Sequence, residues 1–241
     1  VTLQAQASPL AKWSFDEGAG TTVGDSSGNG NIGTATNMSW TTGHNGGSAG
    51  VFNTATNSSL VSIPSSNVTL SSAYTISAWV KLTSNTGDRA IVNRLNNNSP
   101  WNGWGLSLTN GVPRFWHNGW YNSTAPQLST GGWHHVAVVR TSSFALTYYV
   151  DGAAYNTVTV PSTDVYSGPI RIGNDDADRR LDGAVDDLTL YDSALAASDI
   201  AGISARITVS PSTSNYVFEN WSGPDAGSLS STTNPTVTIA Q

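Results

Sequence analysis

The fold class is decided by the stretch Thr75-Ile76-Ser77-Ala78-Trp79-Val80-Lys81-Leu82. Every second residue, from Ile76 to Leu82, is apolar, and this period of two predicts a β-strand with one face in a core. Further short alternating runs occur at residues 136–140, 146–150, 169–173 and 185–191, whereas only residues 195–203 have a helical pattern. The chain is therefore predicted to be all-β.

Turn signals separate these runs. The dipeptides Asn110-Gly111, Asn118-Gly119 and Asp151-Gly152 each lie between two predicted strands. Such pairs supply the positive φ angles that a two-residue β-hairpin needs. Many short strands joined in this way predict a sandwich or a barrel.

A domain boundary is expected near Ala205. Residues 206–241 contain strand-like pieces of their own, at 207–209 and 236–239, around a segment rich in Ser, Gly and Pro. This piece is too short to bury much apolar area alone. We therefore expect a β-sandwich over residues 1–205 and a small β appendage or linker over residues 206–241. Because the first residue is Val1 and no signal peptide is present, we expect a mature or excised part of a longer protein.

Composition narrows the possible partners. The 241 residues carry a net charge of −6, only 11% are charged, and cysteine is absent. Nucleic acid and anionic membranes are not expected as partners, because both require clustered basic residues. Thiol chemistry is excluded, and no apolar run has membrane-spanning length. The neutral surface, rich in hydroxyl groups, favours a secreted or cell-surface location.

Several blocks occur in an order that is known from one superfamily. The opening block is Trp13-Ser14-Phe15-Asp16-Glu17, a middle block is Gly132-Trp133-His134-His135-Val136-Ala137, and the closing block is Leu181-Asp182-Gly183-Ala184-Val185-Asp186-Asp187-Leu188-Thr189-Leu190-Tyr191. Together they resemble the laminin-G-like domains of the concanavalin A-like lectin/glucanase superfamily. The resemblance implies a two-sheet antiparallel jelly-roll sandwich, a structural calcium ion, and glycan or protein binding. Residues 216–223 and 234–239 resemble part of a divergent internalin-type bacterial repeat.

The resemblance also implies where calcium would bind. In this superfamily the chain ends lie side by side, and the ion ties the first strand to the last. Carboxylate oxygens are suitable ligands for this hard cation, so the implied ligands are Asp16, Asp25 and Asp186. For Asp25, a carboxylate that caps a turn is an equal alternative, because Asp-Ser-Ser-Gly is a turn sequence. Zinc is not expected, since the four histidines lack metal-ligand spacing.

Clustered aromatic residues indicate a binding face. The segments Trp101-Asn102-Gly103-Trp104 and Trp116-His117-Asn118-Gly119-Trp120-Tyr121 place four tryptophans and a tyrosine near two turns. An indole plane matches the C–H face of a sugar, and polar side chains match its hydroxyl groups. If Phe115 faces the core, alternation turns Arg114 and Trp116 outward. The predicted carbohydrate-binding residues are Trp101, Trp104, Arg114, Trp116, His117, Asn118, Trp120, Tyr121, Arg171 and Asn174. The alternative is that these tryptophans fill the core.

Catalysis is not expected. Glycoside hydrolysis needs a pair of carboxyl groups, and the only two glutamates, Glu17 and Glu219, lie in different predicted domains. A polysaccharide lyase could use His117, Tyr121, Arg114 and Arg94, but its strand motifs are not recognisable.

The sequence thus predicts a non-catalytic carbohydrate-binding module in an extracellular bacterial protein. Its partner would be a polysaccharide or oligosaccharide, and further domains of the same polypeptide would carry out any catalysis. A lyase, or a protein-binding adhesive or spacer domain, remains the alternative.

Overall fold

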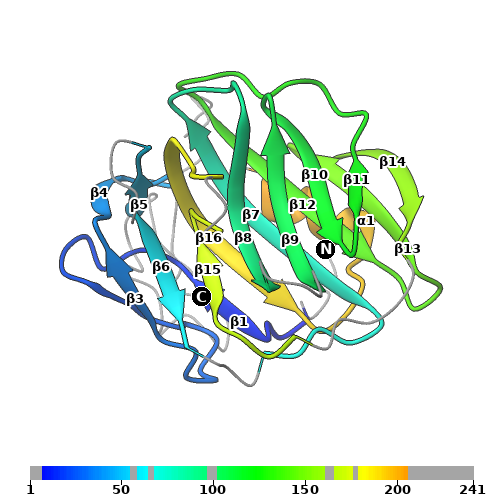
Figure 1. The fold of residues 1–241 in the computed structure, drawn as a ribbon, viewed down its shortest axis with the longest axis horizontal. Coiled ribbons are helices and arrows are strands. Elements are labelled where there is room, and N and C mark those ends of the chain that lie inside the picture. Colours follow the sequence, from blue (N-terminus) through cyan, green and yellow to red (C-terminus); the bar gives the residue numbers. More distant parts are fainter. Residues whose placement is uncertain are drawn as a thin grey trace, which may run out of the picture. The chain divides into compact units, whose positions relative to one another are not determined.

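Alternating side chains build two antiparallel β-sheets in the computed structural model of the chain (Figure 1). The structure describes residues 7–54, 59–64, 68–96, 102–160, 166–175 and 179–205. The chain divides into two units, residues 1–205 and 206–241. The second unit, with its expected internalin-type repeat, lies outside the described residues.

Each sheet has eight strands. Sheet A contains, in spatial order, β14 (Ala153–Thr159), β13 (Ala145–Val150), β12 (Trp133–Arg140), β7 (Tyr74–Leu82), β16 (Gly183–Tyr191), β5 (Ser48–Phe52) and β4 (Ser39–Thr42), with β1 (Ala11–Trp13) paired to β16. Sheet B contains β11 (Trp120–Asn122), β10 (Val112–His117), β9 (Asn102–Thr109), β8 (Asp88–Asn96), β15 (Ile170–Ile172), β6 (Leu60–Ile63), β3 (Gly33–Thr36) and β2 (Thr22–Val23). The predicted all-β sandwich is confirmed.

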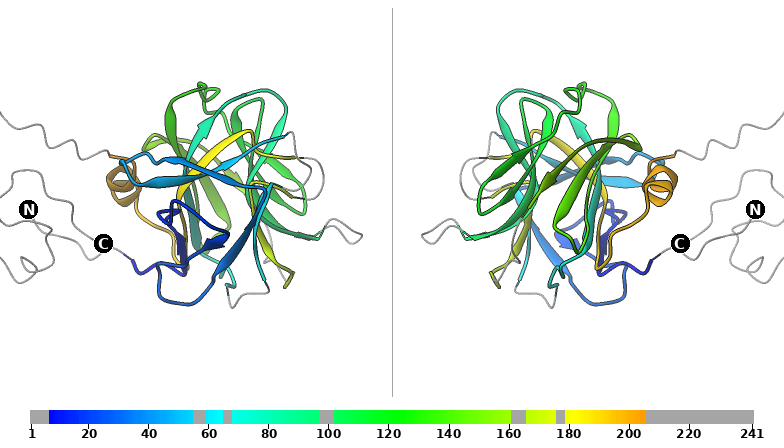
Figure 2. Two further views of the ribbon diagram at one scale, coloured as in Figure 1. Left: turned by 90° about the vertical axis from the view of Figure 1, so that its left-hand side faces the viewer. Right: turned by 90° about the vertical axis from the view of Figure 1, so that its right-hand side faces the viewer.

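The core lies between the sheets. The apolar face of β7, from Ile76 to Leu82, is buried as the alternation predicted. It belongs to one cluster with Leu106 and Leu108 of β9 and Phe115 of β10. The opposite face of β7 is buried too, because other parts of the chain cover the outer surface of sheet A. Helix α1 (Ala197–Ser204) is one of these parts and lies outside the sheet (Figure 2).

The three predicted hairpins form where the turn dipeptides placed them. Asn110-Gly111 joins β9 to β10 with φ angles of 48° and 72°, and Asp151-Gly152 joins β13 to β14 with 49° and 80°. Asn118-Gly119 joins β10 to β11, and Asn118 has a φ of 55°. Asparagine, aspartate and glycine tolerate this left-handed region better than other residues. No helix among the described residues has the length and apolarity to cross a bilayer.

Candidate functional site

The outward face of sheet B carries four of the ten predicted binding residues, namely Arg114, Trp116, Trp120 and Arg171. Phe115 is fully buried in the core, so its neighbours Arg114 and Trp116 on β10 face outward. Strand register then aligns one residue from each of the eight strands in a single line. This cross-strand row consists of Trp120, Trp116, Gly105, Asn93, Arg171, Ser62, Thr34 and Thr22.

At one end of the row, two tryptophans and two arginines pack together. The rings of Trp116 and Trp120 meet edge to face, with centroids 5.0 Å apart. The guanidinium carbon of Arg114 lies 3.6 Å from the Trp120 ring centroid, and that of Arg179 lies 5.2 Å from it. These four residues are called the arginine–tryptophan cluster below. Register of the β10–β11 hairpin therefore pairs Trp116 with Trp120, which the sequence had placed around one turn, and Arg179, which the sequence did not single out, lies over the Trp120 ring.

Two carboxylates hold the arginines of this cluster. Arg114 Nη2 lies 2.7 Å from Asp88 Oδ2, and Arg179 Nε pairs with the buried Asp175. Burial lowers the pKa of Arg114, the hydrogen bond and charge of Asp88 raise it, and the charge of Arg179 lowers it again. Burial would raise the pKa of Asp88, but hydrogen bonds from Thr109 and Arg114 and the arginine charge hold it below 3.8. The two guanidinium groups thus lie close enough to repel each other beside the same indole ring.

The middle of the row is polar. Asn93 Nδ2 donates a 2.8 Å hydrogen bond to the carbonyl oxygen of Asn174, and both asparagines are buried. Arg171 is half-buried and pairs in register with Asn93 on one side and Ser62 on the other. Asn118 is exposed in the hairpin turn. Arg171 and Asn118 are therefore placed where a ligand could reach them, whereas Asn174 contributes its backbone to the floor of the site.

Three predicted sugar contacts face the wrong way. Trp104 and His117 pair in register and both point into the core, where they are 1% and 3% exposed. His117 stacks on Phe115, and burial together with the charge of Arg140 lowers its pKa to about 4. Tyr121 pairs with Phe115 and also packs against the core. The prediction of sugar contact is therefore wrong for Trp104 and His117, and Tyr121 does not lie on the outward face. Trp101 lies outside the described residues.

The same alternation divides the residues considered for a lyase. Arg114 of β10 faces outward, whereas His117 of β10 and Tyr121 of β11 face the core. Arg94 is 5% exposed and donates hydrogen bonds to two backbone carbonyl groups. A catalytic base and an arginine that share a substrate must reach the same space. These four side chains do not meet that condition.

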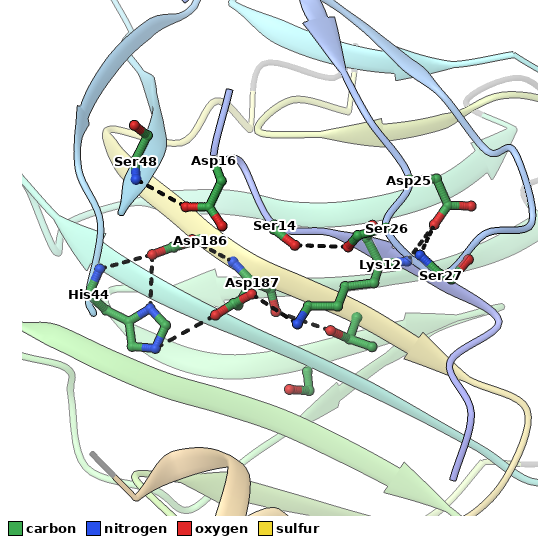
Figure 3. A network of polar contacts seen from close by, with 12 residues as sticks. Lys12, Ser14, Asp16, Asp25, Ser26, Ser27, His44, Ser48, Asp186 and Asp187 are labelled. Atoms are coloured by element: carbon green, nitrogen blue, oxygen red, sulfur yellow. Dashed lines mark hydrogen bonds and ion pairs between the residues drawn. The ribbon is translucent and has the colours of Figure 1, made fainter. Parts of the chain in front are cut away.

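A second polar cluster lies on the outer side of sheet A (Figure 3). His44 donates its backbone N–H to Asp186 Oδ2 at 2.9 Å, and its Nδ1 lies 2.8 Å from the same oxygen. Its Nε2 lies 3.8 Å from Asp187 Oδ2, and its ring stacks on Trp79 with centroids 4.3 Å apart. Lys12 Nζ lies 3.4 Å from Asp187 Oδ1. Sequence spacing could not reveal this cluster, because His44 and Asp186 are 142 residues apart.

Asp25 does not take part in that cluster. Its carboxylate accepts hydrogen bonds from the backbone N–H groups of Lys12, Ser27 and Asn31, at 2.9–3.0 Å, and from Asn31 Nδ2 at 2.8 Å. Burial would raise the pKa of Asp25, but these hydrogen bonds lower it. In Figure 3, Asp25 lies across the view from Asp186. Asp25 thus caps its own turn, as the alternative expected, and does not lie beside Asp186.

Asp16 and Asp186 are the two predicted ligands that fit a cation. Asp16 Oδ1 accepts the backbone N–H of Ser48 at 3.2 Å, and the Asp16 carboxylate lies against Gly47. Asp186 Oδ2 lies against Gly43, at the other side of the same turn. Two carboxylates beside a turn with backbone oxygens form the kind of donor set that Ca²⁺ prefers. Among the described residues, however, the group of three that gathers closely is His44, Asp186 and Asp187.

Comparison with known families agrees with this architecture. A family model for the concanavalin A-like lectin/glucanases superfamily matches residues 53–201, which is more than half of the chain. The chain belongs to this superfamily. A search of curated proteins gave no match.

Solved structures with the same superfamily fold include binding domains and an enzyme. Domain 4 of AbnA, a GH43 extracellular arabinanase from Geobacillus stearothermophilus solved with arabinotriose, is 24% identical, with a TM-score of 0.66 over 83% of this chain and 100% of that one. The binding domain of Paraclostridial Mosquitocidal Protein 1 is 17% identical, with a TM-score of 0.66 over 82% of this chain and 52% of that one. Trypanosoma rangeli sialidase is 16% identical, with a TM-score of 0.64 over 83% of this chain and 33% of that one. The chain thus spans about half of the toxin domain and a third of the sialidase. These likenesses show the fold.

Proposed function

We propose that residues 7–205 form a non-catalytic carbohydrate-binding module. The observation that carries the proposal is the outward Trp116–Trp120 pair, beside the polar cross-strand row of sheet B. An indole beside hydrogen-bonding groups matches both parts of a sugar, its C–H face and its hydroxyl rim. The module would hold a larger extracellular bacterial enzyme or surface protein at a polysaccharide, with a boundary near Ala205.

Similar structures support binding as the role. Domain 4 of the arabinanase was solved with arabinotriose, and the toxin relative is a binding domain. The sialidase is an enzyme, so the fold does not decide between binding and catalysis. Here the side chains favour binding. Glu17 is the only glutamate among the described residues, and its Oε1 accepts the Gly24 N–H at 2.7 Å. The four residues considered for a lyase do not share one face.

A structural cation completes the proposal. Asp186 of β16 and Asp16, which follows β1, lie against the same glycine-rich turn. A calcium ion bound there would neutralise two carboxylates and link the first and last strands of sheet A to the turn before β5.

Affinity electrophoresis tests the sugar-binding role. The wild-type protein is run through gels that contain neutral or anionic polysaccharides, beside Trp116→Ala and Phe144→Ala. Phe144 is an exposed aromatic residue in the turn between β12 and β13, two strands of sheet A, so it controls for loss of a ring. We expect at least one polymer to retard the wild type and Phe144→Ala, and Trp116→Ala to lose this retardation. No retardation in any gel would remove the proposed function.

A further inference from the structure

The arginine–tryptophan cluster is cationic as well as aromatic, and Arg179 is the more accessible of its two arginines, because Arg114 is only 8% exposed. Arg114 lies 3.6 Å above the centre of the Trp120 ring, so a sugar cannot stack on that face. A guanidinium group that lies flat on an indole directs its N–H groups outward in its own plane. On this side, Trp120 therefore supports a hydrogen-bond donor and leaves Trp116 as the open aromatic surface.

Donors in the cluster outnumber the acceptors that the protein supplies. A guanidinium has five N–H donors. Arg114 meets Asp88 through Nη2, and its buried Nε has no hydrogen-bond acceptor among the described residues. Arg179 meets Asp175 through Nε, on one edge of its guanidinium. Each arginine thus has donors beyond those that its carboxylate uses, and both lie over one indole ring.

The few basic residues are also unevenly distributed over the protein. The whole chain has ten Lys and Arg residues against sixteen Asp and Glu residues. Arg114, Arg171 and Arg179 nevertheless gather on the outward face of sheet B or above it. A net charge of −6 acts weakly here, because physiological salt screens charges beyond about 8 Å. Within that distance Arg114 and Arg179 lie beside Asp88 and Asp175, so we expect the N–H donors that those carboxylates leave open, rather than net charge, to select the ligand.

Resting on the proposed function, we propose that this module binds an anionic polysaccharide, and that Arg114 and Arg179 receive a carboxylate or sulfate group of one sugar residue. The anion would relieve the repulsion between the two arginines and would accept charge-assisted hydrogen bonds from both. Trp116, next to them, contacts the apolar face of the sugar.

The cross-strand row also carries Arg171, a second half-buried cation on the same face of sheet B. Trp116 and Arg171 lie in the same row on β10 and β15, with β9 and β8 between them. Three strand spacings separate them by about 14 Å, which exceeds the width of one sugar ring. Gly105 and Asn93, which lie between them in the row, are buried, so Trp116 and Arg171 would be two separate points of contact for a longer polymer.

Matched polymers separate anion recognition from general sugar binding. The probes are polygalacturonate and its carboxyl-reduced neutral form, and dextran sulfate and dextran. We expect the wild type to bind one anionic polymer at least about ten-fold more tightly than its neutral partner, the size of one charge-assisted hydrogen bond. The pair that shows the difference identifies carboxylate or sulfate as the anion.

Three variants locate the effect, each measured by affinity electrophoresis. Arg179→Gln should weaken binding of the anionic polymer about ten-fold, whereas Arg179→Lys should lose less. Arg89→Gln is the matched control, because this substitution removes the same charge at a different place. Arg89 pairs with the core residue Leu108 and thus faces away from Arg114. Arg179→Gln leaves the carboxylate of Asp175 without its ion-pair partner. If this unfolds the protein, the double variant that combines Arg179→Gln with Asp175→Asn removes both charges of the pair.

The outcomes distinguish this inference from the proposed function. Equal binding of anionic and neutral polymers would overturn the inference and leave a neutral carbohydrate-binding module. Equal losses in Arg89→Gln and Arg179→Gln would also overturn it, because they indicate diffuse charge attraction. Binding to none of the polysaccharides would overturn both.

Discussion

Two buried histidines should make the sandwich sensitive to mild acid. His117 is 3% exposed and His135 is fully buried, and burial lowers the pKa of each from 6.5 to about 4. Burial is the main cause of both shifts; the charge of Arg140 adds to that of His117, while for His135 the charge of Asp151 opposes the shift and His44 adds to it. Between these two pKa values the unfolded chain binds protons that the folded protein does not. Stability is therefore complete above about pH 6.5 and is lost as the pH falls toward 4.

The size of this loss follows from the two pKa values. Linkage gives a decrease in the free energy of unfolding of about 2 kcal/mol per histidine at pH 5 and about 3 kcal/mol at pH 4. The two together cost about 4 kcal/mol at pH 5, which is a large part of a typical stability of about 5–15 kcal/mol. Asp25 and Asp88 have pKa values below 3.8, so their contribution is lost only at lower pH.

Urea unfolding at a series of pH values between about 7 and 4 measures this loss. His117→Gln and His135→Gln should each flatten the dependence on pH, whatever their stability at neutral pH. His134→Gln is the control, because His134 lies on the same strand as His135 but is only half-buried. A free energy of unfolding that stays constant from pH 6.5 to 5 would refute the reasoning.

Two further predictions concern packing and the cation. Trp104→Ala should lower the free energy of unfolding by about 3–5 kcal/mol, because it leaves a cavity in the core. Urea unfolding should show a smaller loss for Trp116→Ala, because Trp116 is only half-buried. Equal losses would contradict the placement of the two rings. A chelator should lower the melting temperature of the wild type, because an ion bound only to the folded state stabilises it, and added calcium should restore it. Asp16→Asn should melt at the same temperature with and without chelator. If neither chelator nor calcium changes the melting temperature of the wild type, the ion is removed from the proposal.

Local pattern was enough to predict the architecture and part of the site. Alternation along β7 identified its core face, and the three Asn-Gly and Asp-Gly pairs lie in the hairpins where they were expected. The same rule, counted from Phe115, placed Arg114 and Trp116 outward. Applied one residue further, it would also have turned His117 inward, since residues i and i+2 share a face.

Long-range register is what local pattern could not supply. Trp104 lies near a turn in the sequence, like Trp116, but pairing with His117 places it in the core. Arg179 lies over the Trp120 ring although the two residues are far apart in the sequence, and His44 contacts Asp186 from the other end of the domain. A sandwich is built from such non-local contacts. The sequence therefore names many of the chemical groups in the site, but not the faces on which they meet.

The position of β16 determines when this domain can form during synthesis. β16 lies between β7 and β5 in sheet A and also pairs with β1, although its residues come at the end of the sandwich. A ribosome-bound chain that lacks residues 183–191 would hold two incomplete half-sheets with open edges. Folding must then wait until nearly the whole domain has emerged, and until that moment the nascent chain exposes strand edges to which chaperones or other chains can bind.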